Sequence, residues 1–570
     1  MKMREILAPD LVVTNGRIYT VDKAFSRAEA VAVKGDKIIA VGTGKEIKKL
    51  IGKSTKVLDL EGKTMFPGAI DTHAHFAEFG LRRPPLVLDL HWPQVDSIAG
   101  DVALVADRVK KAAPGEWIQG VGWSCGYLKE VLQDPKRLPN KEDLDAVSPD
   151  NPVCLGSSGG HEIWVNSRVL AIAGITRDTP DPDGGIIVRS PATGEPSGML
   201  RETATGLVSG LIPPWTEKQK KDGILAAMDT YSSLGVTTCN DAGGFVGGNA
   251  ETLRLYSALY REGKFKLRVM PQLSLAGWGG TTRLSVLQEF MKYVGTNTGF
   301  GDNWLRIAGI KIFADGITTG GTGFVTEPYP DGTYGGLVTE GDTTEKQIRS
   351  LKDTIIYGHK HGFQLGIHAS GDRTCEVCVD AIIQAIKEYP WDARHFLIHA
   401  DSLRPDTAQL MAKYNIGVAS QAAVKVATAE RDAVTMGEAR ASSTFPQRMI
   451  IDAGVHLSNS SDAPVTWPNW LKGVEAAVLR ESLLTGKQWG ADQCITVKEA
   501  IRSYTNEGAW LFHMEGLIGS IEVGKLADFC IIDKDILAID PHGIGEVKNL
   551  MTIVGGKIVY PAQPDSLYLK

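Results

Sequence analysis

Between residues 65 and 460, short apolar segments alternate with longer amphipathic ones, and this rhythm constrains the fold more than any other feature of the sequence. Strands that alternate with helices form parallel βα units, in which the helices cover the sheet. The expected strands are residues 65–70, 236–241, 266–275, 306–313, 364–368, 395–399, 416–420 and 456–460. Eight such units predict an α/β fold built on a closed (β/α)8 TIM-like barrel.

The two ends of the chain alternate apolar and polar residues, which is typical of β-strands. Strands are expected at residues 11–20, 29–41, 56–65, 528–533 and 551–560. Hairpin turns are expected at Asn15-Gly16, Gly35-Asp36 and Gly555-Gly556. Neither end is long enough to bury a core alone. We therefore expect a composite β-sandwich domain of residues 1–65 and 518–570, with the barrel at residues 66–517.

A long interval separates the first two predicted barrel strands. It spans about 150 residues, far more than a crossover between neighbouring strands requires. The interval is rich in Gly and Pro and contains Trp117, Trp123 and Trp164. We therefore expect an insert at about residues 81–230 that carries its own structure, and we interpret it as a lid or a pocket wall.

Composition limits the partners of the chain. Lys and Arg total 61 against 67 for Asp and Glu, a net charge of -6 that indicates no surface for nucleic acid. No apolar run reaches the roughly 18 residues that span a bilayer, so no membrane association is expected. The first residues do not resemble a secretory signal, and seven scattered cysteines argue against a disulfide framework. These features predict a cytoplasmic protein.

Polar side chains gather where predicted barrel strands end, which is where barrel enzymes place their reactive groups. His73 and His75 follow the first strand, and their spacing on an extended backbone points both rings to the same side. His368 ends the fifth strand, His399 ends the sixth, and Asp462 follows the eighth. A single strand histidine is usually structural, but this set together predicts a metal site.

Lys311 lies inside the apolar fourth strand. A buried lysine is costly unless it is neutralised, paired or bound to metal. Reaction with CO₂ would convert the amine to a carbamate, whose carboxylate could bridge two cations. This modification is a hypothesis, and an unmodified amine in active, metal-loaded protein would contradict it.

These motifs resemble those of the amidohydrolase superfamily, in the branch of amidohydrolase family 3 that includes N-substituted formamide deformylase. The resemblance covers nearly the whole chain, including the closing Gly-Lys-Leu-Ala-Asp-Phe at residues 524–529 and the insert segment at residues 160–167. Two positions beside the predicted ligands differ from many relatives. Ile398 stands where many have Glu, and Ser460 stands where Gly is frequent.

The resemblance implies a hydrolase that cleaves a C–N bond of an amide, N-acyl or N-formyl compound. It implies two Zn²⁺ ions per chain, with His73 and His75 on the more buried ion and His368 and His399 on the more open one. Modified Lys311 would lie between them. Asp462 would bind metal, take a proton as hydroxide attacks, and return it to the leaving nitrogen.

His161, within the insert, is a candidate for binding the substrate or stabilising an oxyanion. The alternative is a structural role at the start of a helix.

Three other functions remain open from the sequence. Residues 156–160 match Gly-x-Ser-x-Gly, which would make Ser158 the nucleophile of a serine hydrolase, but no matching oxyanion segment is present. A single-metal deaminase or cyclic amide hydrolase of the same superfamily is another, although such deaminases usually carry Glu where this chain has Gly371. The third is a non-catalytic scaffold or regulatory relative. The sequence leaves open whether the chain forms a homo-oligomer.

Overall fold

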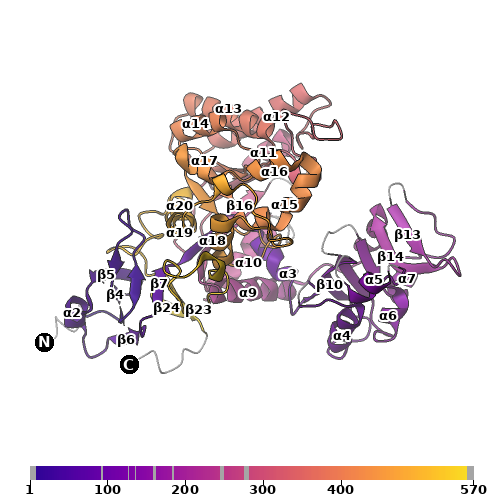
Figure 1. The fold of residues 1–570 in the computed structure, drawn as a ribbon, viewed down its shortest axis with the longest axis horizontal. Helices are drawn as coiled ribbons and strands as arrows, with labels where there is room; N and C mark the ends of the chain where they lie inside the picture. The colour runs from indigo at the N-terminus through magenta and orange to yellow at the C-terminus, as the bar shows by residue number, and fades with distance from the viewer. Residues whose placement is uncertain are drawn as a thin grey trace. The chain divides into compact units, whose positions relative to one another are not determined.

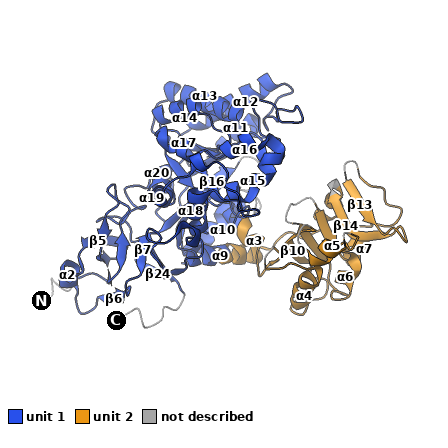
Figure 2. Cartoon of the chain, viewed as in Figure 1, with its two compact units in different colours: residues 1–77, 227–570 blue, residues 78–226 orange. Residues whose placement is uncertain are grey.

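The computed structural model describes residues 8–91, 94–125, 128–134, 136–157, 162–182, 185–243, 249–274 and 282–561. The chain forms two compact units (Figure 2), one of residues 1–77 and 227–570 and the other of residues 78–226. In the described part of the chain, no helix is both long and apolar enough to cross a membrane.

A parallel eight-stranded sheet forms the centre of the larger unit. Its order is β21-β20-β19-β18-β17-β16-β15-β8, so strands that follow one another along the chain are also neighbours in space. The strands are β8 (Ala69–Asp71), β15 (Val236–Asp241), β16 (Arg268–Ser274), β17 (Gly309–Phe313), β18 (Leu365–Ala369), β19 (Phe396–His399), β20 (Gly417–Ser420) and β21 (Leu457–Asn459). All are buried along their whole length, as expected for a parallel sheet covered on both faces. The predicted α/β fold and its eight strands are confirmed.

Hydrogen bonds bring the two edges of this sheet together, so the barrel is nearly closed. The hydroxyl of Thr72 donates to the carbonyl of Asn459 at 3.2 Å. Beyond the strand ends, the amide of Asp462 donates to the carbonyl of His73 at 2.9 Å, and the amide of His75 donates to the carbonyl of Ala463 at 2.7 Å. These bonds place the first and last predicted ligand segments side by side.

Helices pack on the outside of the barrel (Figure 1). They are α10 (Asn249–Arg261), α11 (Leu284–Met291), α12 (Thr344–Lys360), α13 (Asp372–Glu388), α14 (Pro405–Lys413), α15 (Ala422–Met436), α16 (Glu438–Ser443), α17 (Gln447–Asp452), α18 (Trp470–Leu479), α19 (Val497–Ser503) and α20 (Asn506–Leu511). The chain leaves the larger unit within the short helix α3 (Phe76–Leu81). It returns to that unit within the long helix α9 (Glu217–Ser233). Cys375 and Cys378 of α13 are free thiols buried in the core against the barrel.

Two further sheets of the larger unit come from the ends of the chain, and Figure 1 shows their indigo and yellow strands in one β-rich region. The first has the order β24-β23-β22-β7-β2-β3 and the second β5-β4-β1-β6. Their strands are β1 (Leu11–Thr14), β2 (Arg17–Tyr19), β3 (Arg27–Ala28), β4 (Ala30–Lys34), β5 (Lys37–Gly42), β6 (Lys56–Asp59), β7 (Thr64–Pro67), β22 (Phe529–Ile532), β23 (Asn549–Val554) and β24 (Lys557–Tyr560). One apolar core includes side chains from both sheets, among them Val13, Val31, Phe529 and Ile553.

One of the predicted hairpins is wrong. Strands β1 and β2 on either side of Asn15-Gly16 belong to different sheets, because β1 pairs with β4 and β6 while β2 pairs with β3 and β7. All of β1 is buried between its neighbours, so its sequence could not alternate as an edge strand does. The hairpins at Gly35-Asp36 and Gly555-Gly556 are confirmed.

The smaller unit has its own six-stranded sheet, with the order β13-β14-β12-β11-β10-β9. Its elements are β9 (Val87–Asp89), α4 (Ile98–Val109), β10 (Ile118–Trp123), α5 (Lys129–Gln133), α6 (Lys141–Asp145), β11 (Val153–Ser157), β12 (Glu162–Val165), α7 (Ser167–Ile172), β13 (Gly185–Arg189), β14 (Pro196–Glu202) and α8 (Gly206–Ser209). Trp123 and Trp164 pack edge to face in one of its two cores, with ring centroids 6.2 Å apart.

The first predicted barrel strand divides at Gly68, with β7 in the terminal sheet and β8 in the barrel. Thr237 of β15 fills the space where a side chain at residue 68 would lie, because a Cβ there would be 2.1 Å from the Thr237 hydroxyl oxygen. The close approach requires glycine at the junction from which the first ligand segment emerges.

Replacing this glycine should therefore destabilise the protein. We expect Gly68→Ala to lower the free energy of unfolding by about 1–3 kcal/mol, since the added methyl overpacks a buried strand. Gly295→Ala is the matched control, because no atom lies within 4 Å of the new methyl. Thermal unfolding of the two variants compares them, and equal midpoints would contradict the role of the contact with Thr237.

Candidate metal centre

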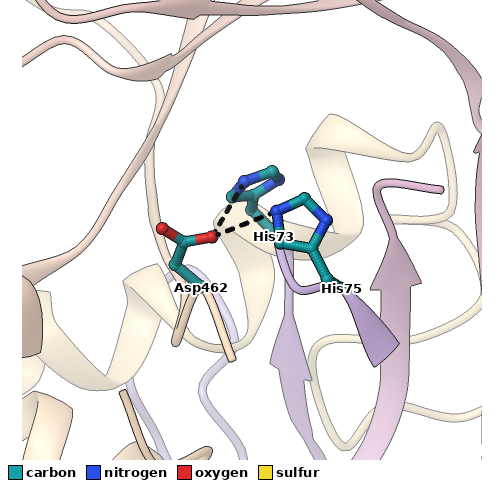
Figure 3. Close-up of side chains that lie close together, drawn as sticks. All are labelled: His73, His75 and Asp462. Atoms are coloured by element: carbon teal, nitrogen blue, oxygen red, sulfur yellow. Dashed lines mark ion pairs between the residues drawn. The ribbon is translucent and has the colours of Figure 1, made fainter. Parts of the chain in front are cut away.

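The side chains of His73, His75 and Asp462 converge at the carboxyl end of the barrel. Their potential ligand atoms all lie within 4.8 Å of one another, and all three residues are buried. One carboxylate oxygen of Asp462 is 3.3 Å from Nε2 of His73 and 3.6 Å from Nε2 of His75. Figure 3 shows the carboxylate facing both imidazoles. Two imidazoles and a carboxylate form a donor set that suits a divalent cation such as Zn²⁺.

The backbone that carries these side chains is fixed by a buried carboxylate that the sequence analysis missed. Asp71, the last residue of β8, accepts hydrogen bonds from the amide and the hydroxyl of Ser461 at 3.0 and 2.6 Å. Asp462 follows with a φ of 53°, a left-handed conformation that costs energy in a residue with a side chain. Asp71 therefore helps to hold Asp462 in a conformation that it would not otherwise favour.

The structure brings the other predicted ligands to the same place. The ring of His399 lies 5.5 Å from that of His73 and 4.5 Å from that of His368, measured between centroids. Lys311, on β17, is fully buried, and its Nζ lies 4.6 Å from the centre of the Phe313 ring. The Phe313 ring in turn lies 5.5 Å from that of His368. Residues that were selected because they lie at the ends of predicted barrel strands, which we call the strand-end rule, thus form one cluster in space.

Burial controls the charge of this cluster. It lowers the pKa of His73, His75 and His399 well below the usual range, and that of His368 to about 4. Burial also lowers the pKa of Lys311 to about 7. Near neutral pH the histidines are therefore uncharged, which is the form that binds cations.

Several of these buried polar atoms lack a hydrogen-bond partner within the described residues. They are Nδ1 and Nε2 of His73, Nζ of Lys311 and Oδ1 of Asp462. Burying such atoms without a partner is costly, and a bound cation would offset that cost. The donor set, its burial and these unsatisfied atoms together fit a divalent metal site.

A second carboxylate that sequence reasoning missed lies between the segments carrying Lys311 and His368. Asp315 accepts hydrogen bonds at 2.7 to 3.1 Å from the amides of Phe324, Ser370 and Gly371 and from the hydroxyl of Thr374. Burial raises its pKa to about 6. The next residue, Gly316, offers its carbonyl to Nε2 of His368 at 2.9 Å, which leaves Nδ1 of that ring for a cation. Asp315 therefore fixes the loop that orients His368.

A third missed residue is Gln421, directly after β20, whose amide oxygen lies 2.7 Å from Nδ1 of His399. Reactive groups follow barrel strands, and Gln421 directly follows the seventh strand, so its position in the sequence could have identified it as a candidate.

Two sequence candidates lie outside the described residues: His161, the proposed substrate-binding group, and Ser158, the nucleophile of the alternative serine hydrolase. Of the aromatic residues near the barrel loops, Tyr329 and Trp470 are buried, whereas Tyr334 and Trp467 are 48% and 44% exposed.

Comparison with known proteins gives a consistent result. A family model described as an amidohydrolase family matches residues 56–560. The putative amidohydrolase YtcJ of Bacillus subtilis is 31% identical, over 96% of this chain and 98% of its own. N-substituted formamide deformylase of Arthrobacter pascens is 28% identical, over 97% of this chain and 98% of its own. A crystal structure of an uncharacterized metal-dependent hydrolase from Pyrococcus horikoshii shares the fold, with a TM-score of 0.71 and 24% identity over 93% of this chain and 99% of that one.

The role of Asp315 can be tested by Asp315→Asn. The amide would turn an NH₂ group toward backbone donors, and we expect a loss of about 1–3 kcal/mol in the free energy of unfolding. The control is Asp331→Asn, since Asp331 also accepts from a Thr amide and hydroxyl but lies at the surface. Thermal unfolding of metal-free protein measures both, and a similar small change in the two variants would contradict the role given to Asp315.

Proposed function

The chain belongs to the amidohydrolase family, and we propose that it is a metal-dependent enzyme that hydrolyses the C–N bond of linear amides such as N-acyl or N-formyl compounds. The observation that carries this proposal is the buried convergence of His73, His75 and Asp462, whose ligand atoms lie within 4.8 Å of one another. The relatives support the general activity, and the choice of linear amides is our inference.

The cluster has enough donors for two Zn²⁺ ions. His73 and His75 would hold the more buried ion, and His368 and His399 the more open one. When bound, the metal supplies acidity that makes water a nucleophile near neutral pH and polarises the amide carbonyl. The proposed substrate is therefore a small amide whose carbonyl reaches the carboxyl end of the barrel.

Asp462 is the proposed general base and acid. Its Oδ1 lies between the two Nε2 atoms of His73 and His75 and has no hydrogen-bond partner within the described residues. The carboxylate would take the proton of the attacking water and return it to the leaving nitrogen, so that the amine departs neutral. We assign His161 a substrate-binding role from its sequence position alone.

Lys311 is the proposed bridge between the two ions. Burial favours the neutral amine, which is the form that attacks CO₂. The Nζ–C bond forms and one proton leaves, giving a carbamate with two oxygens that could each bind a cation. The unsatisfied Nζ atom supports this assignment, because an ordinary buried lysine would have hydrogen-bond partners.

The close packing of the backbone around Gly371 disfavours a single-metal deaminase. Such enzymes usually carry Glu at the position of Gly371, but a Cβ at this position would lie 2.0 Å from the carbonyl oxygen of Phe324. The amide of Gly371 is also held by Asp315. This loop therefore has no room for the glutamate without rearrangement.

We also infer the wider setting of the enzyme. The shared core of the two terminal sheets supports the composite β-sandwich of residues 1–65 and 518–570, beside a barrel at residues 66–517. The seven free cysteines support a reducing, cytoplasmic location.

The variant Asp462→Asn tests the mechanism. We expect it to retain most of its metal and to lose about 10²–10⁴-fold in kcat, since the amide cannot accept and return the proton. Turnover is measured as amine release from a panel of N-formyl and N-acyl amines, with metal content measured on the same samples. Asp342→Asn, at an exposed position, is the control.

Unchanged turnover in Asp462→Asn would remove this residue from proton transfer. Metal-loaded protein that releases no amine from any member of the panel would contradict the linear-amide function.

A further inference from the structure

We propose that Gln421, supported by Ser460, is a positioning residue that fixes the tautomer and ring orientation of His399, so that Nε2 of this histidine faces the metal centre. The inference rests on the proposed function, because it concerns how His399 meets a cation. It adds a residue directly after the seventh strand to a centre otherwise built from strands one, four, five, six and eight.

Gln421 follows β20 and is completely buried. Its side-chain amide makes three hydrogen bonds, and each has a different partner. Oε1 lies 2.7 Å from Nδ1 of His399, while Nε2 lies 2.9 Å from the carbonyl of Ala419 and 2.9 Å from the hydroxyl of Ser460. The side chain therefore links the ends of three neighbouring strands, β19, β20 and β21.

The identity of these partners decides where the protons are. A backbone carbonyl can only accept, so the end of the Gln421 amide that faces Ala419 must be the NH₂ group. The other end, facing His399, must then be the oxygen. An oxygen can only accept from Nδ1, so Nδ1 carries the proton of the neutral imidazole. Nε2 keeps its lone pair and is free to bind a cation.

Ser460 strengthens this assignment. Its hydroxyl donates to the carbonyl of Ser420 at 3.1 Å, so its oxygen accepts from Nε2 of Gln421. Both hydrogens of the amide are thus satisfied, and a flipped amide would place its oxygen against the carbonyl of Ala419. The Ser460 hydroxyl is therefore a second acceptor that locks the amide in this orientation.

The backbone at His399 shows why such support matters. Its φ is 72° and that of the next residue, Ala400, is 54°, both in the left-handed region that residues with side chains avoid. A ring on a strained backbone needs other contacts to define its direction. The bond to Gln421 supplies one on the Nδ1 side of the ring, and the rings of His73 and His368 lie 5.5 and 4.5 Å away between centroids.

Removing a partner that orients a ligand histidine typically costs 10–100-fold in metal affinity, and we expect a loss of about this size in Gln421→Met. The substitution keeps the length of the side chain and removes both polar ends. Gln447→Met is the matched control, because Gln447 is equally buried at the same end of the barrel but bonds to Asn459 and Ser420 rather than to a histidine. Zn²⁺ affinity is measured by competition with a chromophoric chelator.

The inference predicts weaker binding of one Zn²⁺ ion in Gln421→Met, a smaller loss in Ser460→Ala and near wild-type binding in Gln447→Met. Equal affinity in wild type and Gln421→Met would overturn it while leaving the proposed function intact. Wild-type protein that binds no Zn²⁺ would instead contradict the proposed function.

A second measurement needs neither metal nor a folded Gln421 variant. Nitrogen NMR of metal-free protein with ¹⁵N-labelled histidine reports which ring nitrogen carries the proton, and the His399 signals are identified by their loss in His399→Gln. The inference predicts the Nδ1-protonated form at neutral pH. An Nε2-protonated His399 in the wild-type protein would overturn it.

Discussion

The proposed metal centre depends on the hydrogen bonds that join the first and last strands of the barrel. The amides of Asp462 and His75 bond to the carbonyls of His73 and Ala463, and Asp71 holds Ser461 from the other side. Residues nearly four hundred positions apart in sequence are thereby held within hydrogen-bond distance. Without these bonds, two imidazoles and a carboxylate from the first and last segments of the barrel would not meet. The same hydrogen bonds therefore close the barrel and bring the candidate ligands together.

Burying this group of ionisable side chains is unfavourable in free energy, and the surrounding residues compensate only part of it. Four histidines, a lysine and an aspartate are buried together, and burial holds the histidines and the lysine toward their neutral forms. Asp462 and His399 adopt left-handed backbone conformations. Three further polar groups, Asp71, Asp315 and Gln421, use their hydrogen bonds to keep these segments in place. A divalent cation has the charge and coordination chemistry to compensate these unsatisfied atoms, and its binding would stabilise the arrangement further.

The barrel strands could be predicted because each is an apolar run between polar loops, and the strand-end rule then indicated which histidines, aspartate and lysine meet. Two supporting residues, Asp71 and Asp315, were not indicated in this way, since their role is to accept hydrogen bonds from backbone that is distant in sequence. Contacts between segments distant in sequence also explain why the hairpin predicted at Asn15-Gly16 is wrong. Fully buried β1 carries no alternating pattern, so its partners were set by packing against both neighbours. Gly68 divided the first strand because of a contact with Thr237 that no local pattern reveals.

The most direct test of this account is the metal content of protein purified without chelators, measured by plasma mass spectrometry. About two zinc-like ions per chain are predicted, one for the His73 and His75 site and one for the His368 and His399 site. Lys311→Ala should lower this number while the protein remains folded. A wild-type protein that contains no metal and takes up none on reconstitution would contradict the central claim that these buried side chains form a metal centre.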